Sequence, residues 1–192
     1  MIMPLTSTPR GRPAGTSSEK TRQRIISAAI RRVAEVGRSG ATIREIAAGA
    51  EMTSASLYHY FPNKDELMAA TVAAAREIAL PRLHAAAQHG GTVADRLAAV
   101  LTEADRLRHD HPYLAAFERA TGGVSPLRDV IGEIVDEAQR GGSLATGIDG
   151  DGAAAAAYVL TRGLIEQAAQ LSPDAYRATL RCAEDLIRGT LF

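Results

Sequence analysis

The 192-residue chain has a single cysteine, Cys182, so it cannot form an intrachain disulfide or a metal site built from several thiolates. We expect this thiol to be reduced and buried in the last helix. No apolar run approaches the ~20 residues that a membrane-spanning helix needs. The opening Met-Ile-Met-Pro-Leu-Thr lacks the charged-then-apolar layout of a signal peptide. These absences predict a soluble, cytoplasmic protein that does not contact a membrane.

The sequence also lacks the alternation of apolar and polar residues that is typical of β-strands. Apolar residues recur instead at three- and four-residue spacing over most of the chain, which predicts an all-α fold of about nine helices. We expect a first helix at about 18–36 and two long helices at about 152–171 and 173–190. Pro81 should end or kink the helix that begins near Asn63.

Net charge is zero, and this balance conceals an uneven distribution. Residues 1–62 carry nine Arg or Lys against four Asp or Glu, whereas residues 63–192 carry thirteen against eighteen. A basic first third suits a chain whose front end contacts phosphate groups. On charge alone a solvated surface explains the asymmetry equally well, so the interpretation depends on the motifs.

Residues 42–66 have the pattern of a helix, a tight turn and a second short helix. Thr42 and Glu45 have the spacing of a capping box at the start of the first helix, and Thr53 is placed to cap the second. Leu57 falls on the inner side of the second helix. The outward positions are Ser54, Ala55, Tyr58 and His59. In this arrangement the second helix is the element that enters the major groove of DNA.

Residues 1–16 are rich in Pro, Gly, Ser and Thr, and this composition predicts disorder. Within them, Arg10-Gly11-Arg12-Pro13 is similar to the core of an AT-hook. Arg10 and Arg12 would enter a narrow A·T minor groove, where the negative potential is deepest. A basic, solubilising tail is the alternative interpretation.

From Ile25 to Leu67 the chain resembles the DNA-binding domain of the tetracycline-repressor (TetR) family of bacterial transcription regulators. The resemblance covers roughly a quarter of the sequence, and the remainder is similar only in length and helical habit. The matched positions run without a gap: Ile25-Ile26-x-Ala28-Ala29, Gly37, Thr42-Ile43-x-Glu45-Ile46-Ala47 and Ala50-x-x-Thr53-x-x-Ser56-Leu57-Tyr58-His59-Tyr60-Phe61-x-Asn63-Lys64-x-x-Leu67.

Three departures from the family pattern affect local stability more than DNA contacts. Glu51 stands where the family usually has a glycine, so a left-handed backbone there would cost on the order of 1 kcal/mol. Arg32 and Val33 replace an apolar-aromatic pair in the first helix, and Arg38 replaces an aromatic residue.

The resemblance implies three parts: an arm at 1–16, a helix-turn-helix domain at 17–63 and a ligand-binding and dimerisation domain at 64–192. Tyr58 and Lys64 would hold phosphates, and Thr53 would combine capping with a phosphate contact. The remaining candidates would contact base edges or neighbouring backbone. The full DNA-binding set is Arg10, Arg12, Arg44, Thr53, Ser54, Ala55, Ser56, Tyr58, His59 and Lys64.

In the family, the larger domain holds an effector and its last two helices form a four-helix interface between subunits. The implied ligand-binding residues are Met68, Val72, Leu101, Asp105, Tyr113, Phe117, Tyr158 and Arg162. The implied interface residues are Ala153, Ala154, Ala157, Leu160, Leu164, Leu180 and Ile187. For each of these positions, packing or ion pairing within one chain is the alternative.

Together these features predict a homodimeric transcription regulator that binds a pseudo-palindromic DNA operator, represses and is released by a small-molecule effector. We expect no enzymatic activity, no cofactor and no metal. His109 and His111 lie in a Pro-containing turn without a third ligand, and neither a nucleophile elbow nor a phosphate loop is present. Two alternatives stay open: a DNA-binding regulator without a small-molecule effector, and an α-helical adaptor whose basic face meets an acidic protein.

Overall fold

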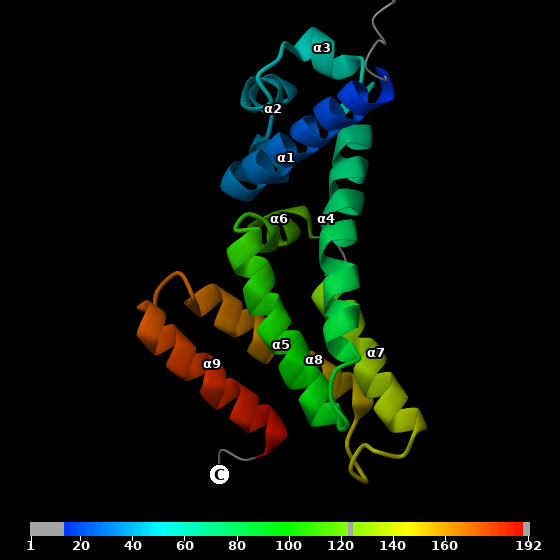
Figure 1. Ribbon diagram of the computed structural model, residues 1–192, viewed down its shortest axis with the longest axis vertical. Coiled ribbons are helices and arrows are strands. Elements are labelled where there is room, and N and C mark those ends of the chain that lie inside the picture. Colours follow the sequence, from blue (N-terminus) through cyan, green and yellow to red (C-terminus); the bar gives the residue numbers. More distant parts are fainter. Residues whose placement is uncertain (1–13, 123–124, 190–192) are drawn as a thin grey trace, which may run out of the picture.

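The computed structural model describes residues 14–122 and 125–189 of the chain, and within these ranges it consists of nine α-helices without a strand (Figure 1). The all-α prediction is therefore confirmed. The helices are α1 (Ala14–Gly40), α2 (Ile43–Gly49), α3 (Ser54–Tyr58), α4 (Lys64–Ala87), α5 (Val93–Asp110), α6 (Leu114–Thr121), α7 (Pro126–Arg140), α8 (Gly150–Gln167) and α9 (Pro173–Arg188).

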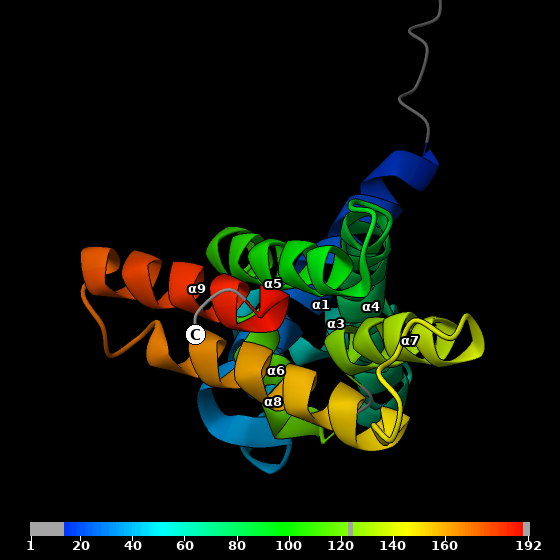
Figure 2. The same ribbon diagram turned by 90° about the horizontal axis from the view of Figure 1, so that it is seen from below.

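Helices α1 to α3 form a unit at one end of the molecule, and α4 runs from this unit along most of the length of the molecule (Figure 1). The far half of α4 packs between α5 and α7. Helices α8 and α9 lie side by side on the outside of this group (Figure 2). The short α6 packs on α1, so it joins the larger group of helices to the first unit.

Local side-chain bonds fix the first unit as predicted. The Thr42 hydroxyl accepts from the Glu45 backbone N–H at 3.3 Å, and the Glu45 carboxylate accepts from the Thr42 N–H at 3.2 Å. Thr53 caps α3 by accepting from the Ser56 N–H at 3.1 Å. Leu57 is fully buried beneath α3, so both helices of the predicted helix-turn-helix are confirmed.

The turn between α2 and α3 contains Glu51 at a φ of 54°, the left-handed conformation expected where the family has glycine. A side chain in this region costs on the order of 1 kcal/mol. Glu51→Gly should therefore raise the free energy of unfolding by about 1 kcal/mol, measured by urea denaturation. Glu51→Ala is the matched control, because it removes the charge and keeps the Cβ. Equal stability of the two variants would show that the backbone at this position is not strained.

One expectation is wrong and another is wrong in part. Pro81 does not end α4, which continues to Ala87, and a kink at this residue stays a prediction. Helix interruption by proline costs about 3 kcal/mol, and the buried Ala79 and Leu83 hold the helix in place on either side. Cys182 is exposed, because the neighbouring Ala183 is the residue that α9 turns inward.

Two clusters of buried apolar side chains hold the helices together. The larger one is continuous from α1 to α7, so the first unit shares its core with the far helices. A small second cluster of Leu101, Leu164 and Ala183 attaches α9 to α5 and α8. Helix α9 is therefore anchored by few buried side chains, whereas α8 also packs against the larger cluster.

Candidate DNA interface and ligand cavity

Helix α3 presents its predicted outward face to solvent at the end of the molecule (Figure 1). Ala55, Tyr58 and His59 are exposed, and Tyr58 retains 48% of its accessible surface. Ser54 and Ser56 are half-buried. A projecting short helix with a buried underside is the shape that a major groove admits.

The other predicted DNA contacts lie around α3. Arg44 is exposed on α2. Lys64 is half-buried, and its ammonium donates to the backbone oxygen of Arg38 at 3.0 Å. The Thr53 hydroxyl lies 3.0 Å from that of Ser56. The roles of these residues stay predictions, and Arg10 and Arg12 lie outside the described residues.

The structure adds basic residues that the motif did not single out. The Arg22 guanidinium lies over the Phe61 ring, 4.9 Å from its centroid, which fixes the start of α1 against the residues that follow α3. Lys20 and Arg24 are exposed on the same turns of α1. The basic charge of residues 1–62 was the only sequence signal for them.

Glu45 has a strongly perturbed carboxylate. Hydrogen bonding to the Thr42 side chain, followed by that to Arg32 at 2.6 Å, lowers the pKa of Glu45 to about 2. A lowered carboxylate pKa stabilises the folded state fully above the unfolded value, near 4.5, and this contribution is lost as pH falls through about 2. The free energy of unfolding should therefore drop less steeply between these pH values in Glu45→Gln than in the parent chain. Urea denaturation at several pH values measures this, with Glu19→Gln as an exposed control. Parallel pH profiles of parent and Glu45→Gln would contradict it.

A small cavity of about 40 Å³ lies among α4 to α8. Most of its wall is alkyl, and three charged side chains, Arg108, Glu118 and Arg162, interrupt it. Its lining residues are Ala79, Leu83, Ala104, Leu107, Arg108, Leu114, Ala115, Glu118, Leu127, Arg162 and Ile165. Apolar walls with a few polar groups are typical of a small-molecule site.

Two larger grooves between α6 and α8 share lining residues with the cavity. The groove next to the start of α7, called the α7 groove below, has a volume of about 480 Å³. It is lined by Glu118, Arg119, Gly122, Ser125, Arg128, Tyr158 and Arg162. The second groove, of about 520 Å³, shares Arg108, Ala115 and Ile165 with the cavity. A molecule that enters between α6 and α8 therefore meets arginines first and alkyl groups deeper inside.

Of the eight predicted ligand-binding residues, the structure brings together Tyr158 and Arg162 in the α7 groove. Tyr113 lines a separate pocket between α1 and the start of α6. Val72 is half-buried on α4. The buried Met68, Leu101 and Phe117 line neither the cavity nor the two grooves.

Asp105 does not line the cavity and instead forms hydrogen bonds that connect α5 with α9. It accepts from the Tyr176 hydroxyl at 2.7 Å and from Arg108 at 2.9 Å. Burial, followed by the hydrogen bond to Asp105, raises the pKa of Tyr176 to about 12. This hydroxyl therefore stays a donor at neutral pH and ties α9 to α5.

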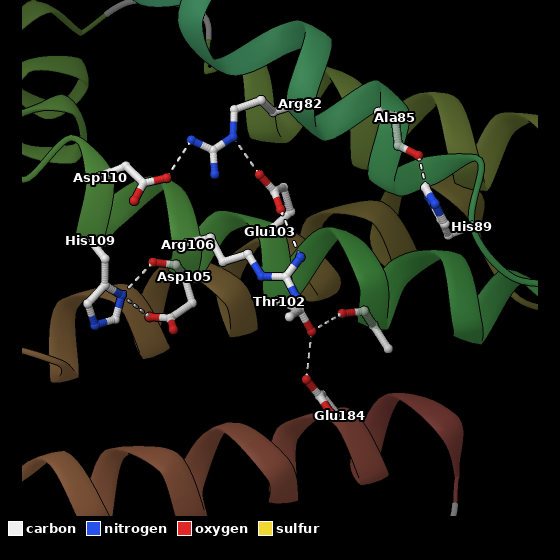
Figure 3. Close-up of polar contacts among 11 residues, drawn as sticks. Arg82, Ala85, His89, Thr102, Glu103, Asp105, Arg106, His109, Asp110 and Glu184 are labelled. Carbon is white, nitrogen blue, oxygen red and sulfur yellow. Dashed lines mark hydrogen bonds and ion pairs between the residues drawn. The ribbon is translucent and has the colours of Figure 1, made fainter.

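Further polar contacts hold α5 between α4 and α9 (Figure 3). The Arg82 guanidinium donates to Glu103 at 2.6 Å and to Asp110 at 2.7 Å. On the other side of α5, the Thr102 hydroxyl donates to Glu184 of α9 at 2.7 Å. Among the described residues, no three His, Cys, Asp or Glu side chains are grouped to hold a metal. The charged residues of this region thus connect helices to one another.

The predicted interface residues of α8 and α9 face inward. Ala154 and Ala157 pack against the main core, and Ala153 is half-buried. Leu160, Leu164, Leu180 and Ile187 belong to the small cluster that joins these helices to α5.

The outer surface of the two helices carries a different set of small and apolar side chains. Val159 keeps 66% of its surface exposed and Leu186 keeps 45%. The exposed set, which we call the α8–α9 face, is Ala155, Ala156, Val159, Gly163, Ala178, Cys182 and Leu186. This face could not be predicted from the sequence, because five successive alanines do not indicate which side of a helix is buried.

Comparisons with known proteins agree with this geometry. Residues 25–71 match the sequence model of the family described as bacterial regulatory proteins, tetR family. These residues include α2, α3 and the turn between them. No curated protein sequence matches the chain.

Solved structures share the fold over nearly the whole chain. A TetR family transcription regulator from Marinobacter aquaeolei VT8 has a TM-score of 0.71 at 16% identity, covering 89% of this chain and 97% of its own. FadR from Bacillus subtilis, in complex with stearoyl-CoA, has a TM-score of 0.68 at 17% identity, covering 88% and 99%. AibR, in complex with isovaleryl coenzyme A and operator DNA, has a TM-score of 0.69 at 20% identity, covering 86% and 97%.

Proposed function

We propose, from the premise that this chain is a TetR-family transcription regulator, that it binds operator DNA as a homodimer, represses transcription and dissociates when a small molecule enters between α6 and α8. The observation that carries the proposal is the exposed face of α3, held by its caps on a fully buried Leu57. The chain would act by binding and not as an enzyme.

On DNA, α3 of each subunit would lie in a major groove of a pseudo-palindromic site. Tyr58 and Lys64 would contact phosphates, which positions the domain without reading sequence. Ser54, Ala55 and His59 would face base edges. Helix α3 has only five residues, and Ser54 and Ala55 have small side chains. Few hydrogen bonds to base edges would therefore contribute to sequence recognition.

The homodimer would form through the α8–α9 face. Val159 and Leu186 are large apolar side chains that the single chain leaves exposed, and burying such groups stabilises association by about 25 cal/mol per Å². Small side chains such as Gly163 and Ala178 allow a second pair of helices to approach closely. A two-fold interface of four helices uses both properties.

The effector would act through α6. The cavity, at about 40 Å³, is far smaller than the roughly 300–1,000 Å³ of ordinary ligand sites. A bound molecule must therefore push α6 and α8 apart. Because α6 packs on α1, its displacement would shift α1 to α3 and change the separation of the two α3 helices. The acyl-coenzyme A ligands of FadR and AibR support a small-molecule site in this fold.

Selection of DNA from a random pool by the purified chain, followed by sequencing, tests the function. We expect an inverted repeat with half-sites about one helical turn of DNA apart or somewhat more. A reporter with that repeat across its promoter should be repressed by the chain. Failure to enrich any sequence at moderate salt would overturn the proposal in favour of an α-helical adaptor. Operator binding that no small molecule weakens would support a regulator without an effector.

A further inference from the structure

Arg162 on α8 has hydrogen-bonding capacity that the described part of the chain leaves unused. Its side chain is only 16% exposed and lines both the cavity and the α7 groove. Its nearest carboxylate oxygens are those of Glu166 at 3.7 Å and Glu118 at 4.0 Å. Charge-assisted hydrogen bonds from a guanidinium are about 2.7–2.9 Å long. Neither carboxylate therefore accepts a hydrogen bond from it.

Other half-buried arginines of the larger helical group, on α4 and α5, make short hydrogen bonds. Arg82 and Arg108 donate to carboxylates at 2.6 to 2.9 Å, and Arg96 donates to the Ala87 backbone oxygen at 2.7 Å. A guanidinium carries five N–H donors in a planar fork and keeps its charge at all ordinary pH values. Arg162 thus places a mostly buried guanidinium beside a cavity, where two carboxylates lie near it and neither is within hydrogen-bond distance.

The surroundings favour an anion over a cation. Burial raises the pKa of Glu118, so this acid accepts a proton more readily than an exposed glutamate. One face of Tyr158, the aromatic ring in the lining of the α7 groove, is covered by the Arg128 guanidinium at 4.5 Å, so a ligand cation near this ring would meet another positive charge. Arg119, at the same mouth, pairs with Glu166 at 3.0 Å. The lining of the α7 groove contains three arginines and one glutamate, and Glu166 next to this lining is shared by Arg119 and Arg162. The arginines therefore exceed the nearby carboxylates by one.

We propose that Arg162 binds the carboxylate of an amphipathic carboxylic acid whose alkyl chain enters the cavity. This inference rests on the proposed function, since it names the class of effector for the same site. Two parallel N–H···O bonds would satisfy the guanidinium fork and the carboxylate together. The alkyl wall beyond Arg162 receives the chain, and the ligand separates α6 from α8 as its chain displaces their contact.

Titration calorimetry of the full chain with three ligands of equal chain length tests the class. Octanoate should bind about ten- to a hundredfold more tightly than octanamide, because a charged acceptor is replaced by a neutral one. Octylammonium should bind most weakly. Equal affinities, or a preference for octylammonium, would overturn the assignment of a carboxylate. Binding of octanoyl-coenzyme A without any binding of octanoate would overturn it as well, because the anion recognised would then be the coenzyme.

Substitutions locate the contact. Arg162→Gln should lower octanoate affinity by about ten- to a hundredfold and leave octanamide unchanged, while Arg162→Lys, which keeps the charge and loses the fork, should lie between. Arg140→Gln, an exposed arginine at the end of α7, is the matched control. Circular dichroism verifies folding. If Arg162→Gln does not fold, Glu118→Gln serves instead: removing a neighbouring negative charge should strengthen octanoate binding several-fold. No change in octanoate affinity with the folded variant contradicts the contact.

Operator release is measured separately, so that the two proposals fail in different ways. If octanoate binds through Arg162 but does not weaken the operator complex, the ligand class is supported and the role of the ligand as an effector is contradicted. Operator release by octylammonium, with no effect of octanoate, upholds an effector and overturns the carboxylate.

Discussion

A Val159→Glu variant should be a folded monomer that binds the full operator about 10²–10⁴-fold more weakly than the parent chain. Val159 is 66% exposed in the single chain, so the substitution removes no internal packing. In a two-fold interface the new carboxylate occurs twice near the axis, and burying unpaired charges costs several kcal/mol. Linked α3 helices gain from a high effective concentration on two half-sites, and a monomer loses that gain.

Light scattering and an operator titration check this result together. Ala73→Glu places the same charge at an exposed position of α4 and is the matched control. Ala157 is a poorer choice than Val159, because it packs against the main core and a charge there would also disturb folding. A parent chain that is monomeric at micromolar concentration, or a Val159→Glu variant that stays dimeric, would exclude the α8–α9 face as the interface.

Truncations on α3 should weaken DNA binding in two distinguishable ways. His59→Ala should cost roughly 1–3 kcal/mol on the selected operator and relax the preference at one base pair, if the imidazole contacts a base edge. Tyr58→Ala should weaken all DNA sequences alike, because a phosphate contact carries no sequence information. Both side chains are exposed, so neither change should lower the stability of the fold.

Competition titrations with operator and scrambled duplexes separate the two effects. His89→Ala, an exposed position just after the end of α4, is the control of the same residue type. If both α3 variants bind the operator as tightly as the parent chain, α3 is not part of the DNA interface. The basic start of α1 would then be the candidate surface.

Features that depend on neighbours along the chain were predictable from the sequence. The capping box of Thr42 and Glu45 and the cap of Thr53 are bonds within one helical turn, so residue type and spacing determine them. The left-handed conformation of Glu51 was expected from the resemblance, because the family usually has a glycine at this position of the turn. The same local patterns established the all-α class and the outward face of α3, since Leu57 and Tyr58 differ sharply in polarity and position.

Features that depend on how distant helices pack were decided by the tertiary structure. The alanine-rich α8 has no clear apolar side, so its contacts with α5 and α7 determine that Ala157 points inward and Val159 outward. The packing of α9 on α5 and α8 leaves Cys182 exposed, and the packing of α4 on α5 and α7 holds the residues after Pro81 in the helix. The cavity combines residues from five helices, and the distances from Arg162 to the carboxylates of Glu118 on α6 and Glu166 on α8 depend on how these helices pack. The periodicity of apolar residues in a sequence predicts which side of a single helix is buried. A binding site depends on how several helices are placed relative to one another, and only the long-range contacts between these helices determine that placement.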